Sequence, residues 1–263
     1  VEVVLNGKHV GNYYLCEQIK VDENRVNIHE MEDTDTEGDA ITGGYLMELD
    51  TYFDEVNKFK SSIKGLPYMF KEPDEDVLNK QQFAYMQNYV NRLEEVLYDD
   101  TYFAIREYAK YIDIDTYIDW WLVHEITFNG EPNHPKSSYM HKDKGGKLKA
   151  GPVWDFDWGT FCTKSGYSIK NTLYYPRLFK NKTFVARVKE RWTLFKPEFE
   201  KIPTFIESEA KRITPSEKMN HSMWPITRVV NGDESLTFDD AVQRMKSIYE
   251  QKVKWLDEAI KKM

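Results

Sequence analysis

Two carboxylates stand one residue apart in the segment Trp154-Asp155-Phe156-Asp157. In an extended segment, side chains at positions i and i+2 point to the same side, so Asp155 and Asp157 could share one divalent cation or hold two. The alternative for an isolated Asp-x-Asp is a solvated turn. The preceding Gly-Pro-Val-Trp favours the cation, because acids among bulky apolar residues are costly unless their charge is compensated.

The elements before this segment come in an informative order. A helix over residues 116–128, capped by Asp115, is rich in bulky apolar residues and predicts a buried element. A loop with an acid, Glu131, follows, and then a hairpin with strands at 139–141 and 147–152. Protein kinases have the same order of helix, acidic loop, hairpin and metal-binding aspartate. Their loop acid faces the acceptor hydroxyl, and their aspartate holds Mg²⁺ on the nucleotide phosphates.

Other chemistry remains open at this stage. A metal-dependent hydrolase could use the same acids, but it would need a further His or Asp ligand near Asp155, and the sequence supplies no obvious one. His134 and His141 flank the loop without the spacing of a zinc site. His124 lies in the apolar helix and is predicted to be a hydrogen-bonded core histidine. Glu131 has the alternative of being a surface loop acid.

The elements that must position these residues predict an α+β fold. Strands are expected at residues 1–5, 13–19, 26–29, 45–49 and 68–71, with an Asn6-Gly7 turn and a solvated acidic loop at 30–39. From residue 74 onward, the apolar residues recur at the spacing of an α-helix. One apolar stripe comprises Phe83, Met86, Val90, Leu93 and Leu97, and a last helix begins after Thr237. We therefore expect a β-rich nucleotide-side lobe at 1–73, truncated at its N-terminus, and a helical lobe at 74–263 that carries the catalytic loop and the metal-binding hairpin.

Composition narrows the function classes. The 263 residues are 41% hydrophobic and 30% charged, which is typical of a soluble globular protein. A net charge of −8 and the absence of a basic stripe argue against a nucleic-acid partner. No apolar run approaches the ~20 residues of a membrane span. Cys16 and Cys162 are far apart and are predicted to be small buried apolar residues. The chain opens directly on a strand pattern, which indicates a fragment of a longer protein.

Several segments together resemble the spore coat protein H (CotH) family of atypical, secreted protein kinases. The resemblance covers nearly the whole chain and is most specific at Trp154-Asp155-Phe156-Asp157. The other segments that carry it are Leu5-Asn6-Gly7, Gly11-Asn12-Tyr13-Tyr14-Leu15-Cys16-Glu17-Gln18-Ile19, Arg25-Val26-Asn27-Ile28, Gly43-Gly44-Tyr45-Leu46-Met47-Glu48-Leu49-Asp50, His124-Glu125-Ile126-Thr127-Phe128-Asn129 and Lys142-Asp143 through Gly151-Pro152-Val153.

The resemblance implies roles for particular residues. Asp155 matches the metal-binding aspartate, and Asp157 is the second acid beside it. Glu131 stands where the family has its catalytic aspartate. Lys71 is the candidate for the lysine that meets the phosphates of ATP, and either Glu17 or Glu48 would pair with it. The implied cofactors are ATP and Mg²⁺ or Mn²⁺, and the implied location is extracytoplasmic, at the cell envelope.

Two departures from the pattern leave the activity open. Glu131 carries one methylene more than an aspartate, which displaces its carboxylate by more than ~1 Å, and misplacement of that order costs ~100-fold in rate. Lys136 stands five residues after Glu131, where kinases have an asparagine that binds metal. Two hypotheses follow: an ATP- and Mg²⁺-dependent kinase that phosphorylates a protein or glycan hydroxyl, or a kinase-like binding or structural module of a cell-surface or spore-coat-type assembly.

Overall fold

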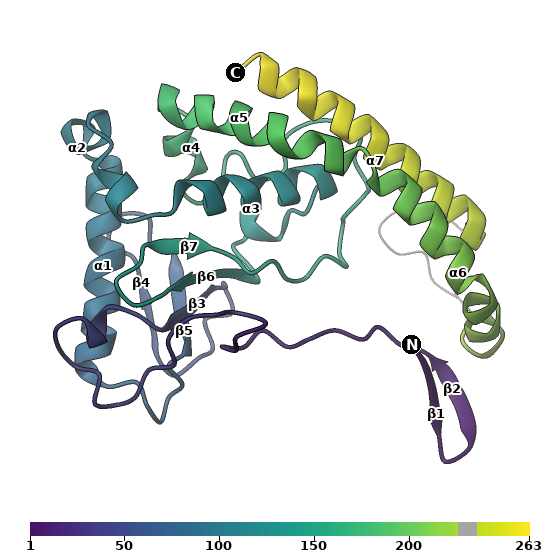
Figure 1. The fold of residues 1–263 in the computed structure, drawn as a ribbon, viewed down its shortest axis with the longest axis horizontal. Coiled ribbons are helices and arrows are strands. Elements are labelled where there is room, and N and C mark those ends of the chain that lie inside the picture. The colour runs from purple at the N-terminus through teal and green to yellow at the C-terminus, as the bar shows by residue number, and fades with distance from the viewer. Residues whose placement is uncertain (226–235) are drawn as a thin grey trace.

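The computed structural model describes residues 1–225 and 236–263 (Figure 1). Its centre is a five-stranded antiparallel sheet with the strand order β4-β5-β3-β6-β7. Helix α1 runs beside this sheet, and α3, α5 and α7 form a layer beyond its β7 edge (Figure 1). Most strands precede most helices along the chain, so the predicted α+β class is confirmed.

The central strand of the sheet is β3 (Tyr45–Leu49). It pairs with β5 (Pro67–Glu72) on one side and with β6 (Ser138–Lys142) on the other. The edges are β4 (Lys58–Lys60) and β7 (Leu148–Ala150). Every residue of β3 is buried, as expected for a strand that is covered on both faces of its sheet.

The two faces of the sheet contact different groups. Tyr45 and Met47 belong to the main hydrophobic core, together with residues of α1 and α3. Leu46 points the other way, into a smaller cluster that contains Val26 and is covered by Trp154. The second face of the sheet therefore lies against the segment that carries the paired aspartates.

The sheet takes strands from both sides of the predicted lobe boundary at residue 73. The hairpin β6–β7, which the sequence places in the helical lobe, pairs directly with β3 of the β-rich lobe. The hairpin itself is present as predicted. The division into lobes at 1–73 and 74–263 thus does not separate two sheets, and as a domain boundary it stays a prediction.

The N-terminal hairpin is shorter than predicted. Strand β1 (Glu2–Leu5) pairs with β2 (Lys8–Asn12), and the turn between them places Asn6 at φ 50° and the following glycine at φ 75°. This turn with two positive φ values returns the chain at once, so the partner strand begins at residue 8. The strands predicted at 13–19 and 26–29 are wrong, because that segment runs over the protein with only an isolated bridge.

Helix α1 (Lys80–Tyr98) begins at Asn79, whose side chain accepts hydrogen bonds from the backbone N–H groups of Gln81 and Gln82. The Gln82 side chain accepts in return from the Asn79 N–H, which completes a capping box. Of the predicted stripe, Phe83 is half-buried and four residues are fully buried: Met86, Val90, Leu93 and Leu97.

Helix α3 (Ile114–Thr127) is capped by Asp113 rather than by the predicted Asp115. The Asp113 carboxylate accepts from the backbone N–H groups of Asp115 and Thr116, at 3.1 and 3.2 Å. The prediction is wrong because two aspartates stand within the same turn, and only the outer one has the extended backbone of a cap. Asp115 is therefore free to bind elsewhere.

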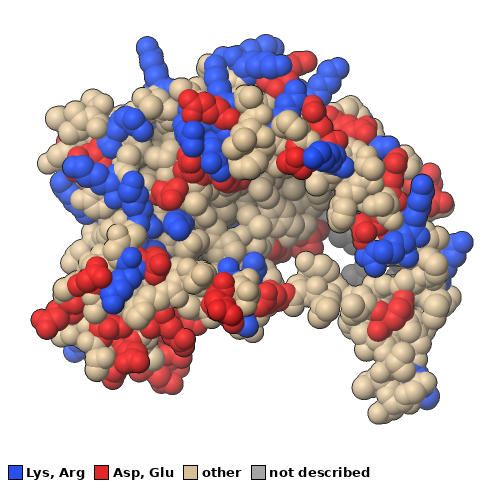
Figure 2. Space-filling model, in the orientation of Figure 1, with Lys and Arg blue, Asp and Glu red and all other residues tan. Residues whose placement is uncertain are grey.

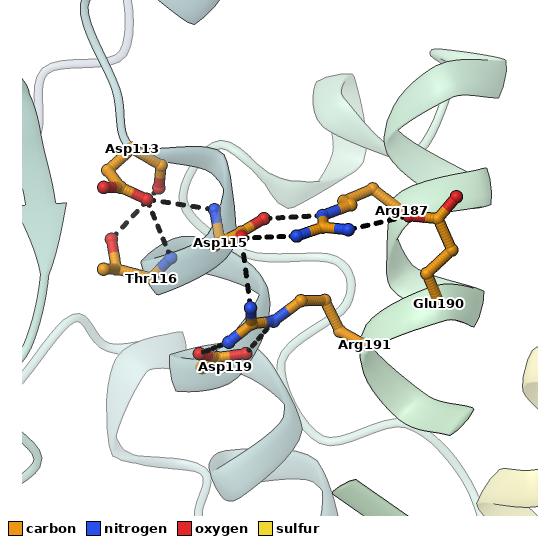
Figure 3. A network of polar contacts seen from close by, with 7 residues as sticks. All are labelled: Asp113, Asp115, Thr116, Asp119, Arg187, Glu190 and Arg191. Carbon is orange, nitrogen blue, oxygen red and sulfur yellow. Dashed lines mark hydrogen bonds and ion pairs between the residues drawn. The ribbon is translucent and has the colours of Figure 1, made fainter. Parts of the chain in front are cut away.

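Asp115 joins a network that fastens α3 to α5 (Figure 3). Its carboxylate accepts from Arg187 at 2.8 Å and from Arg191 at 3.0 Å. Arg191 also donates to Asp119 one turn further along α3, at 2.8 Å. The Arg187 hydrogen bond is the main cause that holds the pKa of Asp115 below its usual range, and the charge of Arg191 adds to it.

The remaining helices are α2 (Asp100–Ala104), α4 (Tyr175–Leu178), α5 (Lys182–Phe199), α6 (Ile202–Met223) and α7 (Phe238–Lys261), with 3₁₀ helices at Ala40–Thr42, Glu107–Lys110 and Glu131–Asn133. The predicted cap of the last helix is confirmed, since the Thr237 hydroxyl accepts from the Asp240 N–H at 3.1 Å. Of the helices in the described part of the chain, none has the length and hydropathy to span a membrane.

A buried ion pair connects α7 to α3. The Lys252 ammonium lies 3.7 Å from the Glu125 carboxylate, and both side chains are almost fully buried. Burial lowers the pKa of Lys252 to about 8. The same Glu125 carboxylate accepts from the backbone N–H groups of Ser168 and Ile169, at 2.7 and 2.9 Å. The end of α3, the segment after the paired aspartates and α7 thus meet at one carboxylate.

The surface differs from the prediction at the cysteines. Cys16 and Cys162 are both exposed, so the prediction that they are buried is wrong. On the face seen in Figure 2, acidic side chains gather below the sheet, whereas most of the visible lysines and arginines lie along the upper side, over the helices. The acidic stretch at 30–39 is a mostly exposed loop, in agreement with the sequence.

We expect Arg191→Ala to destabilise the protein by about 1–2 kcal/mol, because Asp115 and Asp119 lose the cation that both share. Urea unfolding at pH 7 measures this change. The decrease in the free energy of unfolding should become smaller as the pH falls through the depressed pKa of Asp115, because a protonated carboxyl forms no ion pair with the arginine. The matched control is Arg212→Ala on α6, whose exposed pair with Glu209 should contribute little. Equal effects of the two substitutions would show that the network does not hold α5.

Candidate active site

The paired aspartates lie in the loop that follows β7. Asp155 has a left-handed backbone at φ 63°, so the segment is not extended as the sequence analysis assumed. Phe156 between the two acids packs on His124 of α3, with ring centroids 5.1 Å apart. His124 is buried and bonded to the Trp120 carbonyl at 2.8 Å, and burial lowers its pKa to about 4. It is thus a neutral core histidine, as predicted.

Asn129 fixes the geometry of this loop. It follows the end of α3, where Phe128 takes a left-handed conformation that ends the helix. The Asn129 side-chain amide donates to the Asp155 carbonyl at 2.8 Å, and its oxygen accepts from the Glu131 N–H at 2.9 Å. Asn129 is fully buried. One side chain therefore fixes the backbone at two of the three candidate acids, Glu131 and Asp155.

Glu131, Asp155 and Asp157 line one cavity of about 480 Å³, which we call the acid cavity. Other residues that line it include Asp50, Tyr52, His134, Lys136, Ser137 and Trp158. Glu131 is buried rather than a surface loop acid. Its pKa is raised by burial first and by the negative charge of Asp155 second. The acid predicted to face the acceptor and the two predicted to hold metal are thus neighbours.

The side chains of Asp155 and Asp157 are neighbours that interact with each other. The pKa of Asp155 is raised, first by burial and then by its hydrogen bond with Asp157, while the bond from the Ser137 hydroxyl, at 3.1 Å, opposes the rise. Across residues 1–225 and 236–263, no lysine or arginine forms an ion pair with either carboxylate. Two adjoining carboxylates without a cation favour binding a proton or a metal ion.

The donor set fits magnesium better than a transition metal. Among the described residues, no group of three or more His, Cys, Asp or Glu side chains is arranged to hold a metal ion by itself. Mg²⁺ sites in kinases seldom need such a group, because one or two carboxylates suffice when nucleotide phosphates and water complete the octahedron. Asp155 and Asp157, with the Ser137 hydroxyl beside them, provide hard oxygen ligands of that kind.

Lys71 lies on β5 and is paired with two acids. Its ammonium contacts Glu55 closely and lies 3.7 Å from Glu48 of β3. Burial is the main cause that raises the pKa of Glu48. Of the two partners considered from the sequence, Glu48 therefore contacts Lys71 and Glu17 does not. Neither Lys71 nor Glu48 is among the residues that line the acid cavity.

Glu17 lies in the segment that follows the N-terminal hairpin. It is exposed and pairs with Lys20 at 3.6 Å. With Arg25 and both aspartates it lines a second, larger cavity of about 880 Å³, which we call the N-terminal cavity. The two cavities meet at Asp155 and Asp157. Glu17 thus reaches the candidate site without contacting the candidate phosphate-binding lysine.

Sequence reasoning missed Asp50 as a site residue. Asp50 is buried, and its carboxylate accepts from the backbone N–H groups of Tyr52 at 2.7 Å and Ser137 at 3.2 Å. It thereby positions the serine whose hydroxyl binds Asp155. The available signal was its place after strand β3, on the same alternation as Leu46, which faces the cluster covered by Trp154.

Lys136 was noticed in the sequence only as a departure. It lines the acid cavity, donates to the Tyr52 hydroxyl at 3.1 Å and lies 4.3 Å from the centre of that ring. Its positive charge opposes the rise in the pKa values of Glu131 and Asp155. In sequence, this lysine stands five residues after Glu131, where the kinase pattern has its metal-binding asparagine.

These features define a kinase-like protein in which a sheet, a loop acid and a pair of metal-compatible carboxylates meet at one cavity. The family model described as CotH kinase protein matches residues 1–256, and the chain belongs to this family. A search of curated proteins finds no match. The family membership agrees with the resemblance found in the sequence.

Asn129→Ala should destabilise the protein by about 2–4 kcal/mol, because the Glu131 N–H and the Asp155 carbonyl would be left without their partner. Thermal or urea unfolding measures the loss. Asn133→Ala is the matched control in the same loop, since Asn133 is exposed and makes a single bond to the Ser168 carbonyl. A loss no larger than that of the control would mean that Asn129 does not hold the site together.

Proposed function

We propose that this domain transfers a phosphoryl group from ATP, with Mg²⁺ or Mn²⁺, to a hydroxyl of a protein or glycan. The observation that carries the proposal is the meeting of Glu131 with Asp155 and Asp157 in one cavity. Phosphoryl transfer requires oxygen ligands for the metal and a carboxylate near the attacking hydroxyl, and these three acids supply both.

Each acid has a distinct task in this proposal. Asp155 and Asp157 hold the divalent cation, which neutralises the charge on the phosphates when the nucleotide is bound. Glu131 accepts the proton of the acceptor hydroxyl. The pKa of Glu131 is raised toward neutral pH, which suits a group that must gain a proton during the reaction. Ser137, positioned by Asp50, fixes the rotamer of Asp155.

Two lysines supply positive charge around the phosphates. Lys136 lies in the acid cavity, where it can balance charge that moves toward Glu131. Lys71 is proposed to face the nucleotide, since a lysine held by a glutamate is a recurring part of kinase sites. Its contact with Glu48 on the central strand supports that role.

The second hypothesis, a kinase-like module without transfer activity, has its own support. Glu131 replaces the expected aspartate, and Lys136 occupies the place of a metal-binding asparagine. Such a module would bind within a cell-surface or spore-coat-type assembly. For either function, the extracytoplasmic location rests on the family alone.

Purified protein incubated with labelled ATP and Mg²⁺ or Mn²⁺ should incorporate or release label, and Asp155→Asn should reduce this at least ~100-fold because the metal loses a ligand. The control Asp76→Asn removes an exposed loop carboxylate before α1 and should leave the rate unchanged. Equal rates for wild type and Asp155→Asn would reject the enzyme. No transfer by the wild type, with Mg²⁺–nucleotide binding retained, would favour the module.

Metal–nucleotide binding should release protons below neutral pH. Because the pKa of Asp155 is raised in the folded site, this group favours folding most below the ordinary aspartate pKa, and that contribution is lost as the pH rises through the raised value. A bound cation displaces the proton, so affinity should rise with pH over the same range. Calorimetry at a series of pH values above the ordinary aspartate pKa, in buffers of different ionisation enthalpy, counts the protons. Wild type should release protons that Asp155→Asn does not, and identical counts would place the metal elsewhere.

A further inference from the structure

Arg25 lies in the loop between the N-terminal segment and the sheet. Its backbone N–H donates to the Asp22 carbonyl at 3.0 Å, which forms a turn. The next residue, Val26, is buried in the cluster that includes Leu46 and is covered by Trp154. This anchoring fixes the backbone of Arg25 at the edge of the N-terminal cavity, which its side chain lines.

The guanidinium of Arg25 has no partner among the residues that the structure describes. Its Nε is buried without a hydrogen bond, and no carboxylate lies within ion-pair distance of its Nη atoms. Buried donors in proteins are nearly always paired, and an unpaired one calls for an explanation such as a missing ligand. Other arginines of this chain show the usual arrangement, since Arg187 and Arg191 each bind carboxylates.

The charged groups around Arg25 indicate which charges a ligand of this cavity must carry. Glu17, Asp155 and Asp157 line the same cavity, yet none of them pairs with the arginine. A cavity with carboxylates on one part of its wall and an unpaired arginine on another suits an anion that brings its own cation. A polyphosphate chelated by a divalent metal has that charge pattern, with the metal toward the carboxylates and phosphate oxygens toward the arginine.

The shape of the arginine makes the match more specific. A guanidinium presents its Nη–H groups as a fork that binds phosphate oxygens, and in Arg25 these are the donors left for a ligand because Nε is itself buried. Leu15, Val153 and Trp154 add an apolar wall to the cavity, which suits a base. Lys71, which pairs with Glu48 and Glu55, lines neither of the two cavities. Among the described residues that line the N-terminal cavity, the cation is therefore Arg25, whereas Lys136 lines the acid cavity and donates to the Tyr52 hydroxyl.

We infer that Arg25 binds the phosphate oxygens of a nucleoside triphosphate in the N-terminal cavity, while Asp155 and Asp157 hold its divalent cation. This inference deepens the proposed function and rests on it for the identity of the ligand. It assigns the main phosphate contact to the loop at residues 20–26 rather than to the sheet.

Isothermal calorimetry with a non-hydrolysable ATP analogue, tripolyphosphate and adenosine, each with Mg²⁺, tests the assignment. Arg25→Met keeps the apolar stem and should weaken binding of the analogue and of tripolyphosphate by about 10- to 100-fold, the usual effect of losing a charge-assisted fork. Adenosine binding should not change. Arg25→Lys keeps the charge without the fork and should be intermediate. Arg212→Met on α6, which removes an exposed arginine, should match the wild type.

Stability separates a ligand contact from a structural one. Because the guanidinium has no partner in the protein, ligand-free Arg25→Met should unfold at the wild-type temperature or above it. A lower unfolding temperature for this variant would mean that the arginine stabilises the fold, and would overturn the assignment.

The binding outcomes distinguish this inference from the proposed function. Wild-type affinity of Arg25→Met for the analogue would overturn the role of Arg25 and leave the kinase proposal standing. Equal binding of tripolyphosphate and analogue by the wild type, both lost in Arg25→Met, would support the phosphate contact and reject a nucleotide-specific site. Binding of neither probe by the wild type would reject both proposals.

Discussion

The site depends on one buried amide. Asn129 stands just beyond the end of α3 and bonds to both the loop of Glu131 and the loop of Asp155, which approach it from different parts of the chain. A buried amide can satisfy two backbone groups at once only if both are held at hydrogen-bond distance. The relative position of the proposed base and the proposed metal ligands follows from this requirement.

The surrounding helices make that position rigid. α3 is fastened to α5 by the arginine network near its N-terminus and to α7 by Lys252 near its C-terminus. These ionic contacts lie near the two ends of the helix, and apolar contacts lie between them. A shift of the helix along its axis would break both kinds of contact, so its position is fixed. The loop that follows the C-terminal end of α3 is held in place because the helix is.

Local patterns predicted the elements well where one principle governs them. The Asn6-Gly7 turn, the apolar stripe of α1 and the Thr237 cap each depend on residues close in the sequence, and the structure contains all three. The cap of α3 was assigned wrongly because Asp113 and Asp115 both satisfy the local rule. Local rules do not choose between equivalent candidates.

Tertiary contacts account for what the sequence could not reveal. The resemblance named the acids, but the roles of Asn129 and Asp50 come from bonds to residues 26 and 87 positions away. The unpaired state of Arg25 is visible only once its neighbours are known. The predicted strand at 13–19 failed because alternation cannot show whether a partner strand is present.

The Lys252–Glu125 pair has a consequence for biosynthesis. Glu125 leaves the ribosome long before its cationic partner, which lies 127 positions later, so its carboxylate cannot be buried at low cost until α7 has been translated and has docked. A nascent chain that stops short of α7 would therefore contain all the acids of the cavity while the segment that Glu125 anchors stays unfixed. Assembly of the cavity that holds the three acids is consequently a late event, coupled to completion of the domain.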